Sequence, residues 1–169
     1  MELPSNDGVH KLHVVVWQPN GEPKAVLQLS HGMIEFIERY EGLAQYLNEQ
    51  DILVIGNDHL GHGHTAGSDE DLGYFCPEHM SETVVKDLHT VTEYAKKEYP
   101  GIPYFLLGHS MGSFMARRYL IQSINNCISC VACNIKILSI ICCGTHALYI
   151  FHTICSAHDF ISQNTKSVT

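Results

Sequence analysis

Apolar positions along the first 122 residues fall into short continuous runs separated by longer stretches with helical spacing. The runs are bounded by turn-forming residues, which is typical of strands, and an all-apolar run such as 52–55 is typical of a central parallel strand. Tyr40, Leu43 and Leu47 recur at the spacing of one helix face. The pattern as a whole predicts strands at 10–17, 25–29, 52–55 and 104–107, and helices at 40–47, 80–95 and 113–120.

The order of these elements predicts the fold class. Alternation of strand and helix requires right-handed crossovers, so we expect an α/β fold with a doubly wound, mainly parallel sheet. The strand at 10–17 is followed by a hairpin-like turn at 19–21. Functional residues in such sheets lie in the loops after the carboxyl ends of the strands. Here those loops are 30–38, 57–67 and 108–112.

The loop at 108–112 reads Gly-His-Ser-Met-Gly between a predicted strand and a predicted helix. Glycines two residues on either side of Ser110 let the backbone turn sharply, which lifts the hydroxyl out of the sheet. We therefore expect a nucleophile elbow, with Ser110 as the nucleophile, a strained backbone and a side chain facing the loop at 31–34. An ordinary Gly-rich turn is the alternative, because the five-residue pattern also arises by chance.

A nucleophilic serine also requires two N–H donors directed at the developing oxyanion. One is the backbone N–H of Met111, the residue after the nucleophile. The second must come from a neighbouring strand–helix loop, and the turn at His31-Gly32 is suited to that task. The alternative is that this turn only ends a strand.

Histidines gather in the loop at 57–67, where His59, His62 and His64 follow Asp58. Histidine and carboxylate are zinc ligands, so a metal site is one interpretation. Loop metal sites usually draw further ligands from distant segments, however, and no H-E-x-x-H pattern supplies them here. We expect instead that the loop borders the active-site cleft, that its imidazoles hydrogen-bond backbone groups, and that it holds no metal.

Four collinear motifs within residues 10–122 resemble the α/β-hydrolase superfamily, most closely its monoacylglycerol lipase, lysophospholipase and serine aminopeptidase branch. The motifs are His-Gly-Met at 31–33 with Glu-Arg-Tyr at 38–40, Asp-His-x-Gly-His-Gly at 58–63, Tyr-Pro-Gly-Ile-Pro at 99–103, and Phe-Leu-Leu-Gly-His-Ser-Met-Gly at 105–112. The resemblance implies Ser110 as the nucleophile and the backbone N–H groups of Met33 and Met111 as the oxyanion hole. It also implies a lipid-like or small acyl substrate and no cofactor.

The sequence changes character near residue 122. Residues 123–169 hold six of the 7 cysteines but only three charged side chains, and Gly144 is their only glycine. A folded α/β segment needs turn residues between its elements. We therefore expect 1–122 to be the N-terminal part of an α/β-hydrolase domain, truncated before the lid and the C-terminal strands. Residues 123–169 are interpreted as a Cys-rich tail of out-of-frame or alternatively spliced origin.

In this superfamily the triad acid and base follow the nucleophile in the order Ser, Asp, His. Within the tail, residues 137–143 could form the next strand of the sheet. The candidate bases are His146, His152 and His158, and we expect none of them to be catalytic. Two further interpretations are an iron–sulfur site at the Cys127-x-x-Cys130-x-x-Cys133 spacing and a membrane anchor at 137–155. We favour neither, because a fourth cysteine followed by proline is missing and histidines interrupt the apolar segment.

Charge and cysteine usage narrow the function classes. A net charge of −8 argues against nucleic acid or anionic membranes as partners. The first residues lack the basic and apolar regions of a secretory signal, so reduced thiols in the cytoplasm are expected. We predict a cytoplasmic serine hydrolase that cleaves carboxylic esters through an acyl-enzyme on Ser110, with poor or no activity in the chain as written. The alternatives are a peptidase on the same scaffold and a non-catalytic binding fragment.

Overall fold

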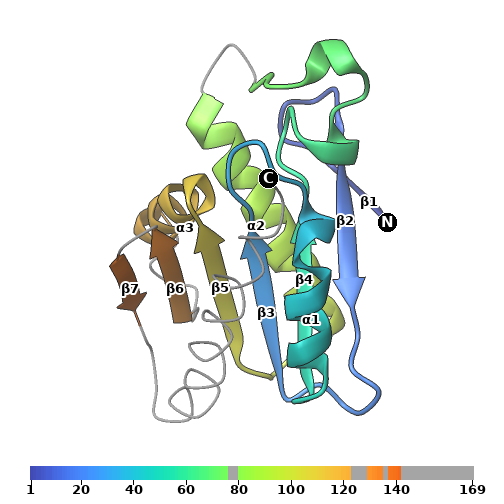
Figure 1. The fold of residues 1–169 in the computed structure, drawn as a ribbon, viewed down its shortest axis with the longest axis vertical. Helices are drawn as coiled ribbons and strands as arrows, with labels where there is room; N and C mark the ends of the chain where they lie inside the picture. Colours follow the sequence, from blue (N-terminus) through green and yellow to red (C-terminus); the bar gives the residue numbers. More distant parts are fainter. Residues whose placement is uncertain (76–79, 123–128, 135–136, 142–169) are drawn as a thin grey trace.

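A computed structural model describes residues 1–75, 80–122, 129–134 and 137–141 (Figure 1), and for the last two segments it describes the backbone alone. The strands are β1 (Glu2–Pro4), β2 (Lys11–Trp17), β3 (Ala25–Ser30), β4 (Ile52–Asn57), β5 (Tyr104–His109), β6 (Ser129–Asn134) and β7 (Ile137–Ile141). The α-helices are α1 (Glu41–Asn48), α2 (Met80–Glu98) and α3 (Met111–Gln122), and the 3₁₀ helices are η1 (Ile37–Tyr40), η2 (Gly63–Thr65) and η3 (Asp69–Asp71). Every strand and helix predicted within the first 122 residues is therefore present, with ends that differ by a few residues.

The described strands form one sheet in the order β1-β2-β4-β3-β5-β6-β7. The four strands β4, β3, β5 and β6 are parallel to one another, and β1, β2 and β7 join antiparallel. The prediction of a doubly wound, mainly parallel α/β sheet is confirmed. The turn at 19–21 does not join hairpin partners, because β4 lies between β2 and β3 and pairs with both. A local turn signal specifies a change of direction and not the neighbour that the strand acquires.

Two strands lie beyond residue 122. β6 runs parallel to β5, with Phe105 opposite Ser129, and β7 pairs antiparallel with β6 at the sheet edge. The sequence predicts 137–143 as the strand that follows the elbow, whereas the structure places 129–134 there and 137–141 one position further out. The other predictions for the tail, which concern its histidines, Cys127 and most of 137–155, fall outside the described residues.

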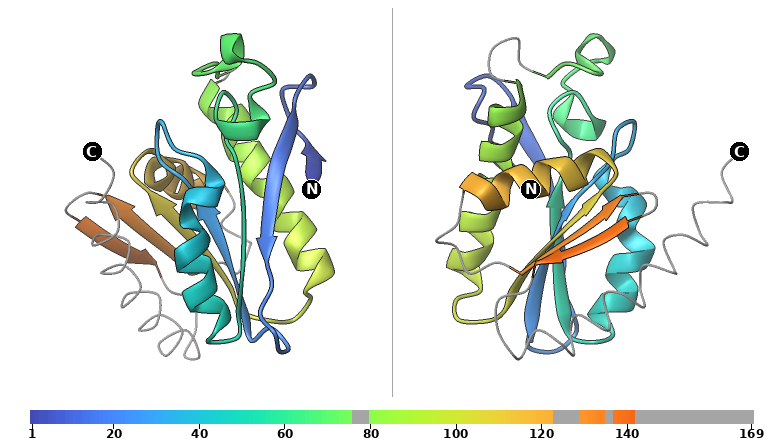
Figure 2. Two further views of the ribbon diagram at one scale, coloured as in Figure 1. Left: turned by 45° about the vertical axis from the view of Figure 1, so that its right-hand side comes forward. Right: turned by 90° about the vertical axis from the view of Figure 1, so that its left-hand side faces the viewer.

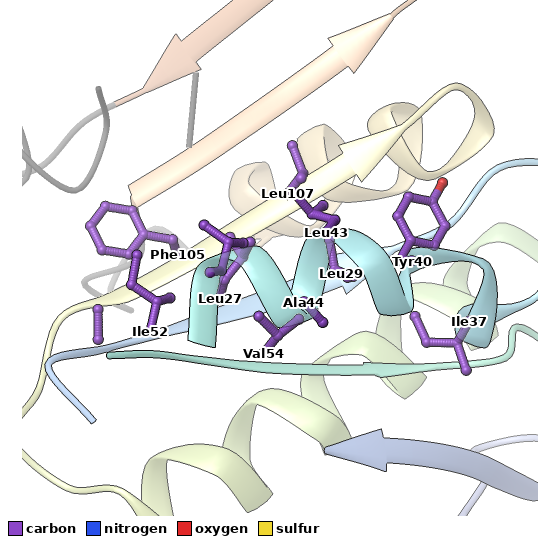
Figure 3. Close-up of a cluster of buried hydrophobic side chains, with 12 residues drawn as sticks. Leu27, Leu29, Ile37, Tyr40, Leu43, Ala44, Ile52, Val54, Phe105 and Leu107 are labelled. Atoms are coloured by element: carbon purple, nitrogen blue, oxygen red, sulfur yellow. The ribbon is translucent and has the colours of Figure 1, made fainter. Parts of the chain in front are cut away.

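Alternation along the strands divides the apolar core between the two faces of the sheet. Leu27, Val54 and Phe105 belong to a buried cluster beneath α1 (Figure 3). Their strand neighbours Val26 and Leu53 belong to a second cluster on the opposite face, which includes side chains of α2 and α3. Figure 2 shows α1 on one side of the sheet and α2 and α3 on the other. Covering both faces leaves the carboxyl ends of the parallel strands as the edge where loops meet.

Candidate active site

Ser110 is the single residue between β5 and α3, as the predicted nucleophile elbow requires. Its φ is +50°, in the left-handed region, which costs a non-glycine residue about 1–2 kcal/mol. A residue stays in such a conformation only when its surroundings hold it there. Ser113 contributes to this restraint, because its N–H (3.0 Å) and its hydroxyl (2.6 Å) both donate to the carbonyl oxygen of Ser110.

The two glycines of the elbow allow close approach of backbones. A Cβ on Gly108 would lie 2.4 Å from the carbonyl oxygen of Gly112, and a Cβ on Gly112 would lie 2.0 Å from that of Ser30. Backbone atoms at such distances have no room to move aside without displacing the strand. The glycines therefore let the first turn of α3 lie directly against the ends of β3 and β5.

The loop after β3 faces the elbow. A Cβ on Gly32 would lie 3.2 Å from the Cβ of Ser110, so the serine side chain is directed toward the loop at 31–34. The N–H of Gly32 is already used within the loop, since it donates to Glu35 Oε2 at 2.8 Å. The backbone N–H of Met33 remains the predicted oxyanion donor of this loop, and that of Met111, at the start of α3, remains the other.

Glu35 holds this loop in place, a role that the sequence interpretation missed. Its Oε2 accepts hydrogen bonds from the Gly32 N–H and from the Tyr40 hydroxyl (2.7 Å), and His109 Nδ1 lies 3.2 Å away. Burial by itself would raise the pKa of Glu35, but the hydrogen bonds from His109, Tyr40 and Gly32 outweigh it and lower the pKa to about 2. Glu35 is therefore ionised at neutral pH. The available sequence signal was a carboxylate three residues after the loop glycine.

The rings of His31 and His59 are buried side by side beneath the site, with centroids 4.2 Å apart. His31 Nδ1 donates to the carbonyl of Gly32 (2.7 Å), and its Nε2 accepts the backbone N–H of His59 (2.9 Å). A neutral His31 ring can make both of these hydrogen bonds. Burial disfavours the charged ring and lowers the pKa of His31 to about 4. The second of these bonds connects the loop after β3 to the loop after β4.

One of the three histidines in the loop after β4, His62, makes the backbone hydrogen bond that the sequence suggested, whereas His59 meets a side chain of β3. His62 Nδ1 donates to the carbonyl of Leu60 at 2.9 Å, and His59 Nε2 lies 3.1 Å from the hydroxyl of Ser30. His64 differs, because its ring lies 4.8 Å from that of His13 and close to Glu38. The premise that this loop has no distant ligand residues is therefore wrong, since β2 and η1 supply them, and the metal-free expectation loses that support.

The described part of the chain contains the predicted nucleophile, Ser110, but no proton acceptor bonded to its hydroxyl. No described histidine or carboxylate hydrogen-bonds the Ser110 hydroxyl, and the tail histidines fall outside the described residues.

Among the described helices, none has the length and apolar character needed to cross a bilayer.

Known proteins with similar sequences include several monoglyceride lipases. The chain is 43% identical over 96 residues to a monoglyceride lipase of Rattus norvegicus. The aligned segment makes up 57% of this chain and 30% of that protein. It is 35% identical over 114 residues to a monoacylglycerol lipase of Mycolicibacterium smegmatis, and the aligned segment makes up 66% of this chain and 39% of the relative. The chain thus spans between about 30% and 39% of the length of these relatives.

Solved structures show the same architecture. A thermostable carboxyl esterase from Bacillus coagulans superposes with a TM-score of 0.73 at 30% identity, covering 79% of this chain and 43% of the esterase. A monoglyceride lipase from Saccharomyces cerevisiae has the same fold with a TM-score of 0.60 at 21% identity, covering 73% of this chain and 39% of the lipase. Residues 21–152 match the family described as serine aminopeptidase, S33, and this match continues past residue 122. The chain therefore belongs to the S33 serine aminopeptidase family of α/β-hydrolases.

Proposed function

We propose that this chain carries the nucleophile and the oxyanion hole of a serine hydrolase that cleaves carboxylic esters of lipid-like substrates, of the monoacylglycerol or lysophospholipid type. The observation that carries the proposal is the strained Ser110, at φ +50° between β5 and α3, with its side chain directed at the loop at 31–34. Ser110 is half-buried at this turn, and the backbone amides of Met111, the next residue, and of Met33, in the facing loop, are the proposed oxyanion donors.

The reaction follows from that placement. Ser110 Oγ attacks the ester carbonyl carbon, and the negative charge that develops on the carbonyl oxygen is stabilised by the N–H groups of Met33 and Met111. The C–O bond to the alcohol breaks, the serine proton passes through a general base to the departing alcohol, and water then hydrolyses the acyl-serine. Glu35 takes no part in these bonds and acts by positioning the loop.

Apolar side chains beside the nucleophile support a lipid-like substrate. Met33 is 60% exposed, Ile34 89% and Phe36 49%, all in the loop that faces Ser110. Apolar surface gathered at one site favours contact with an apolar partner, here an acyl chain. The proposal retains the cytoplasmic location expected from the cysteine content.

Ester hydrolysis by this chain is expected to be slow, because the described residues provide no base for Ser110. Loss of a triad member typically lowers the rate by about 10⁴ to 10⁶. We would measure hydrolysis of p-nitrophenyl butyrate by the wild-type chain, by Ser110→Ala, and by Ser68→Ala as an exposed serine control. Imidazole is then added as an external base, and the Ser110→Ala rate is subtracted to remove uncatalysed hydrolysis.

We expect a low Ser110-dependent rate that imidazole increases and that Ser68→Ala retains. A fast Ser110-dependent rate without imidazole would show that residues outside the described segments supply a base, and the expected inactivity would be wrong. Absence of any Ser110-dependent rate, with or without imidazole, would overturn the proposal in favour of a non-catalytic binding protein. That second candidate is favoured by the lack of a described base beside Ser110.

A further inference from the structure

Three metal-ligating side chains that are distant in the sequence converge at one place in the fold. His13 lies on β2, Glu38 on η1 and His64 on η2. Their ligand atoms, one from each residue, all lie within 4.8 Å of one another. Figure 1 shows η2 beside β2. His64, which follows β4 in the sequence, therefore lies near His13, which precedes β3. None of the three has a role in the serine chemistry proposed above.

The three ligand atoms lie close enough to hold a small metal ion once their side chains move together. His13 Nε2 lies 2.6 Å from Glu38 Oε1, and the rings of His13 and His64 meet edge to face. Zinc ligand atoms lie about 2.0–2.1 Å from the metal, so two of them in a tetrahedral site are roughly 3.3 Å apart. The His13–Glu38 pair, at 2.6 Å, therefore has to open by less than about 1 Å, and the cluster, whose ligand atoms lie within 4.8 Å of one another, has to close by up to about 1.5 Å. The second carboxylate oxygen, Glu38 Oε2, is buried and has no hydrogen-bond partner, so a bound cation would stabilise a carboxylate that is incompletely satisfied.

Two buried residues, Asp58 and Thr65, fix the backbone at or next to each of the three candidate ligands through hydrogen bonds. Asp58 accepts the N–H of Ile37, next to Glu38, and the N–H of His64, each at 2.7 Å. The hydroxyl of Thr65 accepts the N–H of His13 (2.9 Å) and donates to the carbonyl of Asp58 (2.8 Å). Because the backbones are fixed in this way, metal binding requires movement of the ligand side chains and not of the elements that carry them.

We propose that His13, Glu38 and His64 form a zinc site with two histidines and one glutamate, whose fourth position is open to water on the exposed side of His64. Imidazole with a single carboxylate is a zinc-type donor set, whereas magnesium and calcium prefer oxygen ligands and iron–sulfur clusters require thiolates. A bound zinc ion would connect β2, η1 and η2. Since η1 follows the loop at 31–35, the ion would also restrain the segment that faces Ser110.

The test is zinc binding to the full chain, purified without a histidine tag and with its cysteines alkylated by N-ethylmaleimide so that thiolates do not compete. Affinity is measured by competition with a chromophoric chelator, and cobalt substitution reports the ligand set through visible bands without thiolate charge transfer. The variants are His64→Ala, which removes an exposed ligand, and Glu38→Gln. His89→Ala is the matched control, because His89 is a half-exposed histidine on α2 outside the cluster. Circular dichroism verifies that each variant is folded.

We expect one zinc per chain, with affinity lowered about 100-fold or more by His64→Ala and at least about 10-fold by Glu38→Gln, since loss of a partner that only orients a ligand already costs about 10–100-fold. His89→Ala should leave the affinity unchanged. Equal zinc affinities of the wild-type and His64→Ala proteins, or no stoichiometric binding by the wild type, would overturn the proposal and leave the cluster as an ion-pair network alone.

Discussion

Replacing Glu35 by Gln is expected to destabilise the loop that faces Ser110. The side chain of Glu35 is only 10% exposed and accepts hydrogen bonds from Gly32 and Tyr40. Its pKa is lowered from 4.5 to about 2, mainly by the bonds from His109, Tyr40 and Gly32, which overcome the opposing effect of burial. At about 1.4 kcal/mol for each unit of pKa, that difference corresponds to about 3.5 kcal/mol of stability at neutral pH. Because glutamine keeps one acceptor oxygen, we expect Glu35→Gln to lower the free energy of unfolding by about 2–3 kcal/mol.

The pH dependence identifies the ionised carboxylate as the cause. A carboxyl group whose pKa is lower in the folded state contributes its full stabilisation above its unfolded value, here 4.5, and loses it as the pH falls toward about 2. The stability difference between the wild type and Glu35→Gln should therefore be present at pH 7 and 5 and should shrink as the pH falls below 4.5. Urea unfolding followed by circular dichroism at pH 7, 5 and 3 measures it.

Glu22→Gln serves as the matched control, because Glu22 is an exposed glutamate in a loop. It should change the unfolding free energy by less than about 0.5 kcal/mol at each pH. A Glu35→Gln protein as stable as the wild type at pH 7, or a stability difference that persists undiminished at pH 3, would refute the argument that the ionised Glu35 stabilises the loop.

Two further predictions concern the elbow. Gly112→Ala should lower the unfolding free energy by about 1–3 kcal/mol in urea, because its Cβ would lie 2.0 Å from the Ser30 carbonyl oxygen. Gly67→Ala, whose Cβ would meet only the side chain of Asp71 at 3.3 Å, should cost less, and equal losses would contradict the packing argument. Ser110→Gly should be more stable than Ser110→Ala by about 1–2 kcal/mol in thermal unfolding, since glycine adopts φ +50° without strain. Equal stabilities of those two variants would show that the serine backbone is not strained.

The sequence determined the local structure wherever sterics and burial act over a few residues. The apolar runs predicted β3, β4 and β5, because a strand covered on both faces excludes polar side chains from most of its length. The glycines at 108 and 112 predicted the elbow, because only residues without a Cβ permit the backbone approaches found there. The chemistry proposed for Ser110 depends on this local geometry and on the order of the motifs, and both can be read from the amino-acid sequence.

Tertiary structure decided which residues become neighbours. β4 enters between β2 and β3, an arrangement that no turn signal encodes, and it brings Thr65 within hydrogen-bonding distance of the backbone of His13. The same sheet order assembles His13, Glu38 and His64, whose ligand atoms come within 4.8 Å although they lie on three separate elements. Periodicity specifies which face a side chain occupies, but long-range strand pairing depends on the free energy of the whole packed sheet. For that reason the proposed nucleophile could be predicted from the sequence, and the proposed zinc site could not.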